Sequence, residues 1–573
     1  MILRFRPGRS LALLALTTLL AASCSSGGGD GGDDQADTKP APSAGNDIGA
    51  TDPAELAEGG TLRWPLTEIP PNFNQHELDG SLGDNASVMG ALMPSVFDFD
   101  AAAEPVLKTE YATSADLTAT EPKQVVTYRI NRKAAWDDGT AITVADFEAQ
   151  WRALNGTDQE FKVVSTQGYD KIDSVAKGAD EREVVVTFKA PYADWRGLFS
   201  PLFPAATNRD PAVFNDGWRG KVPTSAGPFR FGGLDETAKA ITLVRNEKWW
   251  GRRARLDKIV FRAIDQDAQV ESLANGEVDF AGTGSDVTKL RIAQGIDGVE
   301  IRQAAAPNFN HLTINGTSEN LSDVNVRRAL TRGIDRATIA RALLGPLGVA
   351  PTPLGNHIFM TNQKGYRDNS GPLSYDVEAA RGLLDGAGWA LPTGGKVRVK
   401  DGRELDLRLV LPTQSTIGKQ IAELIRTMVA EVGIDVRLEL VPGDDFFEKY
   451  VTPGNFDLVL FSWGGTVFPV SSSKSIYAKP KPGPDGGLDI QQNYARVGSD
   501  ELDRLFDEAT ASFDAEKTIE LGNRIDELIW DEVHSVPVYQ IPGNVAVKET
   551  LANFGAFGFA STVYEDIGFR AAG

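Results

Sequence analysis

Cysteine and histidine are scarce in this sequence, which has one cysteine and four histidines among 573 residues. A single cysteine cannot form an internal disulfide, and it cannot supply the thiolate cluster of a zinc or iron–sulfur site. His76, His311, His357 and His534 show no close spacing along the chain, which argues against a nickel or haem site. We therefore expect no metal and no other cofactor.

The motifs of several enzyme classes are also missing. The sequence has no G-x-S-x-G nucleophile elbow and no G-x-x-x-x-G-K-[ST] phosphate-binding loop. Neighbouring carboxylates such as Asp137-Asp138 and Asp444-Asp445 stand in turn-like sequence, which favours solvated loop charges over an acid–base pair. The sequence therefore predicts no catalytic residue.

Basic residues are fewer than acidic residues. The sequence has 58 lysines and arginines and 79 aspartates and glutamates, which give a formal net charge of −21. Such a surface repels the phosphates of nucleic acids, so we do not expect nucleic-acid binding. We interpret the negative charge mainly as a means of keeping the protein soluble.

The first 24 residues have the order of features found in a secretory signal: a positive start, a short apolar run and small residues before Cys24. The apolar run, Leu11 to Leu20, is roughly half the ~20 residues that a membrane-spanning helix needs. Small residues before a cysteine resemble the bacterial lipobox, in which the cysteine is lipidated, although Ala21 stands where the best-matching form has leucine. An ordinary signal peptide with an incidental cysteine is the alternative.

We expect residues 1–24 to be a lipoprotein signal peptide, and Cys24 to anchor the exported chain to the outer face of the cell membrane. Residues 25–58 are rich in Gly, Ser, Pro and Asp and have almost no large apolar side chain, which predicts a disordered acidic tether. Its r.m.s. reach would be about 30 Å, enough for a mobile body to meet a membrane partner repeatedly.

The rest of the chain is too long for one hydrophobic core, since single cores stop growing near ~250–300 residues, and we expect two or more lobes. The clearest unit is at 405–440. Leucines alternate over 405–411, apolar residues repeat with a helical period over 417–429, Gly433 can end the helix, and 434–440 alternates again. This strand–helix–strand pattern predicts parallel strands with a right-handed crossover.

Ligands of open α/β sheets lie outside the carboxyl ends of the strands, which points to Gln414 and Ser415 after the strand at 405–411. A helix N-terminus at this point would suit a ligand carboxylate. The alternative for Ser415 is that it simply caps its helix.

Other elements also have clear patterns. Thr143 and Asp146 form a capping box before a helix that buries Phe147 and Trp151, further helices are predicted at 323–344, 376–386, 500–513 and 516–532, and strands at 125–130, 458–461 and 535–539.

Four segments stand in a fixed order along the chain. The first joins 126–130 to Trp136-Asp137-Asp138-Gly139-Thr140 and 143–147; the second is Ser225-Ala226-Gly227-Pro228-Phe229 with Arg245-Asn246 and 249–251; the third is 326–330 with 333–336; the fourth runs from Tyr375-Asp376 to Gly388-Trp389. Together they resemble the extracellular solute-binding proteins of family 5, the peptide- and nickel-type substrate-binding lipoproteins of ABC importers. The resemblance covers about 61–545.

The resemblance implies an α/β protein with the two-lobed type II periplasmic-binding-protein fold and an extra subdomain in the first lobe. The expected boundaries are 59–308 for lobe I, with the inserted subdomain at about 89–221, 309–525 for lobe II, and 526–573 for the return to lobe I. It also implies a monomer that closes around a peptide-like solute and delivers it to permease subunits in the membrane. A solute-sensing receptor lipoprotein for signalling, or a binder of a non-peptide organic solute, is the alternative.

The ligand-binding residues are expected in a few loops. They are Asn72, Phe73, Asn74 and His76 after the first strand, Gly227 near the lobe junction, Trp463, Gly464, Gly465 and Thr466 after the strand at 458–461, and Asn493 and Tyr494, together with Gln414 and Ser415 from the strand-end argument. In peptide-binding members an Asp after the equivalent tryptophan pairs with the α-amine of the peptide. Thr466 occupies that place here, so this charge-assisted contact is missing and a free peptide N-terminus is in doubt.

Three of these aromatic or imidazole assignments have structural alternatives. Trp463 and Phe73 could line the floor of an apolar pocket, or they could pack in the core. His76 could contact the ligand, or it could be a solvated loop histidine.

Overall fold

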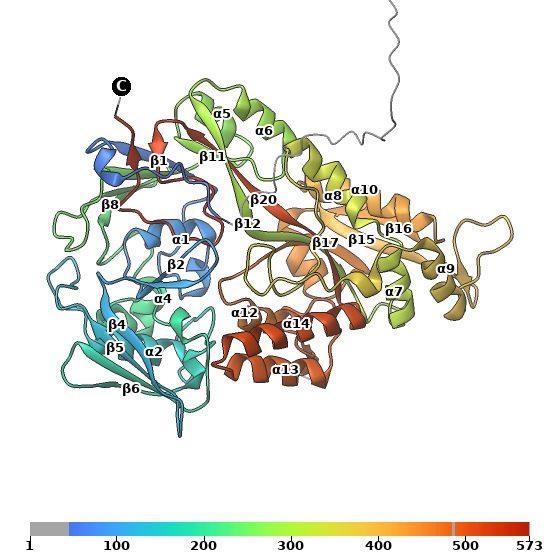
Figure 1. Cartoon of the computed structure of the whole chain (residues 1–573), viewed down its shortest axis with the longest axis horizontal. Helices are drawn as coiled ribbons and strands as arrows, with labels where there is room; N and C mark the ends of the chain where they lie inside the picture. The colour runs from blue at the N-terminus through green and yellow to red at the C-terminus, as the bar shows by residue number, and fades with distance from the viewer. Residues whose placement is uncertain (1–44, 484–486, 572–573) are drawn as a thin grey trace, which may run out of the picture. The chain divides into compact units, whose positions relative to one another are not determined.

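The computed structural model describes residues 45–483 and 487–571 (Figure 1). The predicted signal peptide, Cys24 and residues 25–44 of the predicted tether lie outside this part of the chain. In the part that is described, no helix is both long enough and apolar enough to cross a membrane.

The prediction of disorder is wrong for residues 45–58, which pack on lobe I. Asp47 and Ala556 exchange two backbone hydrogen bonds of 2.8 and 2.9 Å, and the Asp47 carboxylate accepts the N–H of Gln303 at 2.9 Å. Leu56 is buried and begins a short bridge to Arg570. One apolar side chain and paired backbone groups thus order a segment whose composition alone indicates a tether.

Lobe I contains two four-stranded sheets that share one apolar core. The first sheet has the order β1-β10-β9-β8, with β1 parallel to β10. The inserted subdomain has the antiparallel order β4-β5-β7-β6, with α2 packed on β6 and β7. The bounds are β1 (Thr61–Leu66), α1 (Gly83–Gly90), β2 (Phe97–Phe99), β3 (Pro105–Leu107), β4 (Ala112–Ala119), β5 (Val125–Ile130), α2 (Val144–Leu154), β6 (Ile172–Lys177), β7 (Glu183–Phe188), α3 (Ala205–Asn208), α4 (Pro211–Asp216), β8 (Phe229–Asp235), β9 (Ala240–Arg245) and β10 (Lys258–Ala263).

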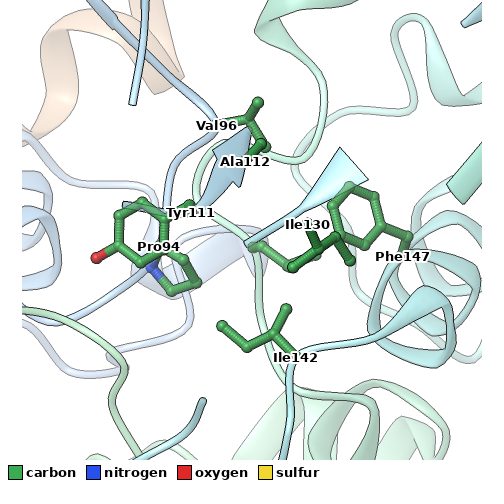
Figure 2. Close-up of a pocket in the computed structure, with 8 residues that line it drawn as sticks. Pro94, Val96, Tyr111, Ala112, Ile130, Ile142 and Phe147 are labelled. Atoms are coloured by element: carbon green, nitrogen blue, oxygen red, sulfur yellow. The ribbon is translucent and has the colours of Figure 1, made fainter. Parts of the chain in front are cut away.

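The predicted capping box of α2 is confirmed. The Thr143 hydroxyl accepts the Ala145 N–H at 3.3 Å, and the Asp146 carboxylate accepts the Thr143 N–H at 2.8 Å. Phe147 is buried as predicted, whereas Trp151 is only partly buried. A void of about 10 Å³ lies beside Phe147 and Ile130, in a mainly apolar part of this core that also includes Tyr111 (Figure 2). It is barely the size of one water, so it is a packing defect and not a solute site.

Lobe II is built on a six-stranded sheet with the order β11-β20-β12-β17-β15-β16. Its strands are β11 (Phe280–Gly282), β12 (Val299–Ile314), β15 (Asp406–Pro412), β16 (Asp435–Val441), β17 (Leu458–Gly464) and β20 (Ser535–Lys548); its minor strands are β13 (Val399–Lys400), β14 (Arg403–Glu404), β18 (Lys481–Pro482) and β19 (Leu488–Asp489). The strands β21 (Leu551–Ala552) and β22 (Gly568–Phe569) pair with each other on lobe I. The helices from α5 onward are α5 (Gln269–Ala274), α6 (Val287–Gln294), α7 (Val324–Arg332), α8 (Arg336–Leu344), α9 (Val377–Gly386), α10 (Thr416–Ala430), α11 (Gly443–Asp445), a π-helix (Phe446–Val451), α12 (Pro469–Tyr477), α13 (Asp500–Ala511) and α14 (Ala515–Glu532).

The predicted strand–helix–strand unit is confirmed. β15 and β16 pair in parallel from Asp406↔Asp435 to Pro412↔Val441, and α10 connects them. The apolar stripe of α10, which includes Ile421 and Ile425, is buried. Gly433 follows this helix with φ +87°, a conformation that glycine adopts without strain.

Two long antiparallel strands, β12 and β20, connect the lobes. The first part of β12 pairs with the part of β20 that also pairs with β11, and the last part of β12 pairs with β17. The register shifts between Ala305 and Phe309, so the crossing strands are interrupted there. The strand predicted at 535–539 is longer in the structure, because β20 continues through Pro542 and Gly543 to Lys548.

The predicted boundary at 308/309 falls at this register shift. The boundary at 526 does not fit the structure, because 526 is inside α14, where Ile525 and Ile529 pack with Leu502 and Phe506 of α13. The chain returns to lobe I only along β20. The helix predicted at 323–344 is two helices, because Gly333 follows α7 and the Asp335 carboxylate caps α8 by accepting the Thr338 N–H at 2.9 Å.

Candidate functional site

The carboxyl ends of β15 and β17 lie at one edge of the sheet, because the two strands are parallel. A pocket of about 210 Å³ lies beyond the end of β17. Four predicted ligand residues line it: Trp463, Gly464, Gly465 and Thr466. The remaining wall comes from other segments, namely Phe309, His357, Ile358, Met360, Pro469, Ser472, Ser473, Ile476, Tyr477 and Gln492.

Aromatic rings pack around Trp463, one of the residues that line this pocket. The Trp463 ring is stacked on Tyr494, with centroids 5.9 Å apart and planes 1° from parallel. The Phe461 ring stands edge-on to Trp463 at 5.1 Å, and the buried His311 ring lies behind the indole at 5.9 Å. Trp463 is therefore only partly buried: one part packs in the lobe and another faces the pocket.

The described lining of the pocket includes no Asp, Glu, Lys or Arg side chain. Its polar groups are mainly hydroxyls, and the Thr466 hydroxyl lies 2.8 Å from that of Ser472. The Thr466 carbonyl accepts a hydrogen bond of 2.9 Å from Gln363. Such a lining can bind an uncharged, partly apolar group, and it offers no ion-pair partner to an ammonium group.

Gly465 places the end of β17 against the crossing strands. Its N–H donates to the Pro307 carbonyl, and a Cβ at this position would lie 3.0 Å from Met360 and 3.1 Å from the Pro307 oxygen. Pro307 belongs to the part of β12 where the register shifts. The floor of the pocket therefore contacts the point at which the two lobes are joined.

The predicted residues after the first strand are placed elsewhere. Asn72, Phe73 and Asn74 are fully buried in lobe I. The Asn72 amide donates to Glu77 at 2.9 Å and to the Asn215 carbonyl at 2.7 Å, and the Asn74 amide donates to the Phe214 carbonyl at 2.9 Å. Their polar groups are thus occupied in holding this loop, and Phe73 packs in the core.

His76 is not the solvated histidine that the sequence offered as an alternative. Its Nε2 lies 3.0 Å from the Pro201 carbonyl oxygen, and its ring packs against Phe203 at 5.2 Å. Desolvation lowers the pKa of His76 to about 4. Gly227 is also internal, buried in lobe I, where its carbonyl accepts the Asn246 amide at 2.9 Å.

Three other predicted residues of lobe II, Gln414, Ser415 and Asn493, do not line the pocket. Gln414 is exposed at the carboxyl end of β15, and its amide lies beside Gly443 at the end of β16. Ser415 is at the N-cap of α10, but its side chain makes no capping hydrogen bond, contrary to the alternative we considered. Asn493 is fully buried and donates to the carbonyls of Ala478 and Val497 at 2.8 and 2.6 Å.

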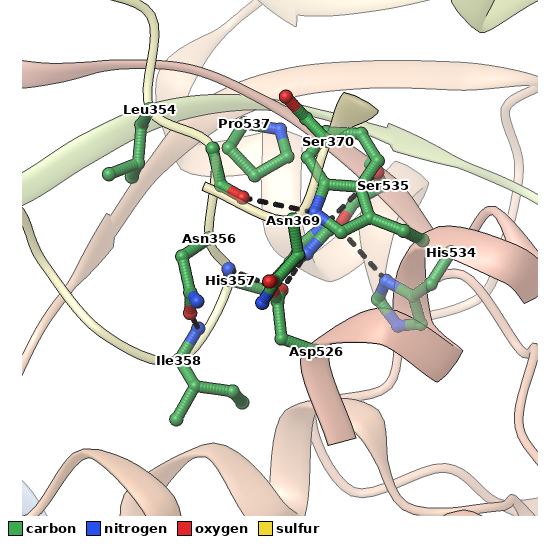
Figure 3. Close-up of polar contacts among 12 residues, drawn as sticks. Leu354, Asn356, His357, Ile358, Asn369, Ser370, Asp526, His534, Ser535 and Pro537 are labelled. Carbon is green, nitrogen blue, oxygen red and sulfur yellow. Dashed lines mark hydrogen bonds and ion pairs between the residues drawn. The ribbon is translucent and has the colours of Figure 1, made fainter. Parts of the chain in front are cut away.

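Three of the four histidines, His311, His357 and His534, are distant in sequence but lie in one buried region of lobe II. His357 Nδ1 lies 2.7 Å from the Asp526 carboxylate and its Nε2 lies 3.1 Å from the Ser535 carbonyl oxygen (Figure 3). His534 lies 3.1 Å from the Ser535 hydroxyl and 3.0 Å from the Asn493 side-chain oxygen. Among the described residues no group of His, Cys, Asp and Glu has an arrangement that could hold a metal ion. This network is structural, and it supports the wall of the pocket through His357.

Contacts between the lobes lie next to the pocket. The Phe99 and Phe468 rings are perpendicular with centroids 5.5 Å apart, and the Gln167 amide donates to the Ser471 carbonyl at 3.2 Å. Ala193 N–H donates to the Thr510 carbonyl at 3.0 Å. Ser471 belongs to α12, which also provides Pro469 and Ser472 to the pocket wall.

Known proteins have similar sequences and the same arrangement of lobes. A family model described as bacterial extracellular solute-binding proteins, family 5 Middle, matches residues 105–484. The oligopeptide-binding protein OppA of Mycobacterium tuberculosis (strain ATCC 25618 / H37Rv) is 42% identical over 539 residues, which are 93% of this chain and 89% of that protein. The periplasmic EDTA-binding protein EppA superposes with a TM-score of 0.83 at 28% identity, over 92% of this chain and 98% of the other.

AppA of Bacillus subtilis, solved with a nonapeptide, has a TM-score of 0.73 at 19% identity over 90% and 99% of the two chains, a likeness that concerns the fold alone. The structure is thus a two-lobed α/β solute receptor with the type II periplasmic-binding-protein fold. The chain belongs to the bacterial extracellular solute-binding proteins of family 5. It is the solute-binding protein of an ABC importer and not an enzyme, as the sequence predicted.

Proposed function

We propose that this chain is a lipid-anchored receptor that captures a peptide or peptide-like solute between its two lobes and delivers it to the permease of an ABC importer. The observation that carries the proposal is the pocket beyond β17, where Trp463 and Thr466 face Phe309 of the crossing strand. The similarity to a protein named for oligopeptide binding supports a peptide as the solute.

The position of the pocket explains how binding would be transmitted. Its floor contacts Pro307 through Gly465, and its α12 wall touches the inserted subdomain of lobe I. A solute in the pocket would contact groups whose positions depend on how the lobes are arranged. Binding would then favour the closed arrangement by the difference between the solute's affinities for the two forms.

Export, lipidation at Cys24, location in the cell envelope and action as a monomer belong to the same proposal. The order of features before Cys24 supports export and lipidation. A lipid anchor would keep the receptor near the permease, and several acyl chains would be needed for a stable anchor.

A non-peptide organic solute is the second candidate, and the lining of the pocket favours it. The place of an amine-binding carboxylate is taken by Thr466, and the described lining has no acidic side chain. A peptide with a blocked N-terminus, or an uncharged organic molecule, would lose nothing from this absence, whereas a free ammonium group would be desolvated without an ionic partner.

Native mass spectrometry of the protein purified from its own cells would test the proposal. We expect a bound species that dissociates on activation and fragments as a peptide series. A bound molecule without peptide fragments would replace the peptide by the second candidate. Isothermal titration of a stripped sample with a random peptide library and with its N-acetylated form would then show whether peptides bind; no heat from either would refute the peptide assignment.

A further inference from the structure

Phe468 immediately precedes α12, and two residues of the pocket hold its backbone. The Thr466 hydroxyl accepts the Phe468 N–H at 3.1 Å, and the Ser472 hydroxyl donates to the Phe468 carbonyl at 2.9 Å. Thr466 and Ser472 both line the pocket, and their hydroxyl oxygens lie 2.8 Å apart. A solute that moves or fixes these hydroxyls would therefore move or fix Phe468 as well.

The half-buried ring of Phe468 contacts two residues of lobe I. It is perpendicular to Phe99 of β2, with centroids 5.5 Å apart, and it lies against Gly197. A Cβ added at Gly197 would lie 2.6, 3.2 and 3.4 Å from three carbons of this ring, closer than to any other atom outside the adjacent residues. Carbon atoms in contact are normally about 3.5–4.0 Å apart. In this arrangement the ring therefore occupies space that a side chain at 197 would need.

The backbone at Gly197 does not itself require glycine. Its φ is outside the left-handed region, in which glycine is favoured. Its N–H donates to the Asp194 carbonyl at 3.0 Å within the 3-10 helix Trp195–Gly197, a bond that any residue other than proline can make. The contribution of glycine at this position is thus the space that it leaves for a ring from the other lobe.

Polar contacts accompany this aromatic contact. The Gln167 amide donates to the Ser471 carbonyl at 3.2 Å, and the Ala193 N–H donates to the Thr510 carbonyl at 3.0 Å. Burial raises the pKa of Asp194, and a hydrogen bond with the Ser471 side chain opposes this effect. Ser471 and Thr510 belong to α12 and α13, on the side of lobe II that faces the inserted subdomain (Figure 1). Because hydrogen bonds need a narrow range of distances and angles, these contacts fit one arrangement of the lobes.

We propose that Phe468 is the positioning residue that couples the pocket to closure of the lobes. Its backbone follows the pocket hydroxyls of Thr466 and Ser472, and its ring enters the space beside Gly197 when the lobes close. The inference rests on the proposed capture of a solute between two closing lobes. A solute that holds the two hydroxyls in the observed arrangement would place the ring for its contact with Phe99, and would thereby bind the closed form more tightly than the open one.

The test is a distance measurement between the lobes by double electron–electron resonance. Spin labels are attached at Lys133→Cys on lobe I and Glu520→Cys on lobe II, two exposed positions, in the mature protein with Cys24→Ser. Distances are recorded without solute and with an N-acetylated random peptide library. The ratio of short to long distances measures closed against open molecules.

Three single variants should each lower this ratio by about threefold or more, which is the effect expected from loss of one aromatic pair. Phe468→Ala and Phe99→Ala remove the two rings, and Gly197→Ala places a methyl group where the Phe468 ring lies. Two variants are matched controls and should leave the ratio unchanged. Gly83→Ala adds a methyl group that meets nothing within 4 Å, and Phe513→Ala removes an exposed ring of lobe II.

The double variant Phe468→Ala/Gly197→Ala separates coupling from local damage. Once the ring is absent, the methyl group at 197 has no atom of Phe468 to meet, so Gly197→Ala should have little further effect. Fully additive effects, or equal ratios in the wild type and all variants, would overturn the inference. If the library changes no distance in the wild type while the variants still differ from it, the proposed peptide capture fails and the role of Phe468 is supported.

Discussion

The rings of Trp463 and Tyr494 are parallel within 1° and stack across a gap between the end of β17 and the loop that precedes α13. Phe461 stands edge-on to both rings, at 5.1 and 6.1 Å. The three rings form one rigid unit, so the face of Trp463 that lines the pocket is held in place before a solute arrives. Such preorganisation reduces the ordering cost of binding.

Replacing Trp463 by alanine should therefore weaken solute binding by about tenfold or more while the chain still folds, since it removes both a contact surface and a stacked partner. Tyr494→Ala should weaken binding less, because it removes only the support. Titration with the solute identified by mass spectrometry measures both effects. Trp151→Ala, which truncates a partly buried tryptophan of lobe I, is the control, and an affinity unchanged by Trp463→Ala would exclude a role for this ring in binding.

Substitutions of Thr466 test whether the pocket recognises the free α-amine of a peptide. We expect the wild-type protein to bind a peptide and its N-acetylated form with similar affinity, because the described lining has no carboxylate. Thr466→Asp should create a preference for the free amine, and Thr466→Asn, which has the same size without the charge, should not. A strong preference for the free amine in the wild type would show that another carboxylate serves the amine.

The buried His357–Asp526 pair should contribute strongly to the stability of lobe II. The Asp526 carboxylate accepts the backbone N–H of His357 at 2.7 Å, lies 2.7 Å from the ring nitrogen and accepts the Asn369 amide at 2.8 Å. Asp526→Ala should lower the free energy of unfolding by about 3–5 kcal/mol in urea titrations. Asp531→Ala, which breaks an exposed pair with Arg328, should cost less than about 1 kcal/mol. Similar losses in the two variants would contradict this ranking.

Stability should also fall in acid because of a buried histidine. Burial, with a smaller contribution from His357, lowers the pKa of His311 to about 3. Below about pH 6.5 the unfolded chain binds a proton that the folded chain does not, so the free energy of unfolding decreases as the pH falls. At pH 5 the loss from this one residue is roughly 2 kcal/mol. His311→Gln should lose correspondingly less between pH 7.5 and pH 5 in urea titrations, and parallel curves for the two proteins would refute the assignment.

The anchor at Cys24 is tested by cell fractionation. Cys24→Ala should move the exported protein from the membrane fraction to the medium or periplasmic fraction, because no lipid could be attached. Ser26→Ala, two residues away, should remain with the membrane. Retention of Cys24→Ala on the membrane would show that the chain is held in another way.

The elements of strong periodicity could be predicted from the sequence. The unit from β15 to β16 follows from alternating leucines and a helical apolar stripe, and the capping box at Thr143 follows from two residues three apart. The crossing strand β12 could not be predicted, because the stretch Gln303 to Asn310 alternates weakly and contains Pro307. Its pairing with β20 depends on residues more than two hundred positions away.

The site could be predicted only in part, for a related reason. Trp463 to Thr466 follow the buried run Leu458 to Leu460, and the end of β17 places them at the pocket. Asn72 and Asn74 have the residue types of a ligand loop, but the backbone carbonyls of Phe214 and Asn215 already occupy their amides. Sequence does not show which partner a loop amide finds. Met360 and Phe309, which also line the pocket, carry no local signal of this role.

The bridge between Asp47 and Ala556 has a mechanical consequence. It fastens the first described residues to the C-terminal segment of lobe I, and Asp47 also holds Gln303 at the start of a crossing strand. A pulling force transmitted from the N-terminal side would therefore enter the protein through the C-terminal segment of lobe I and through the first half of β12, before the register shift at which the lobes are joined.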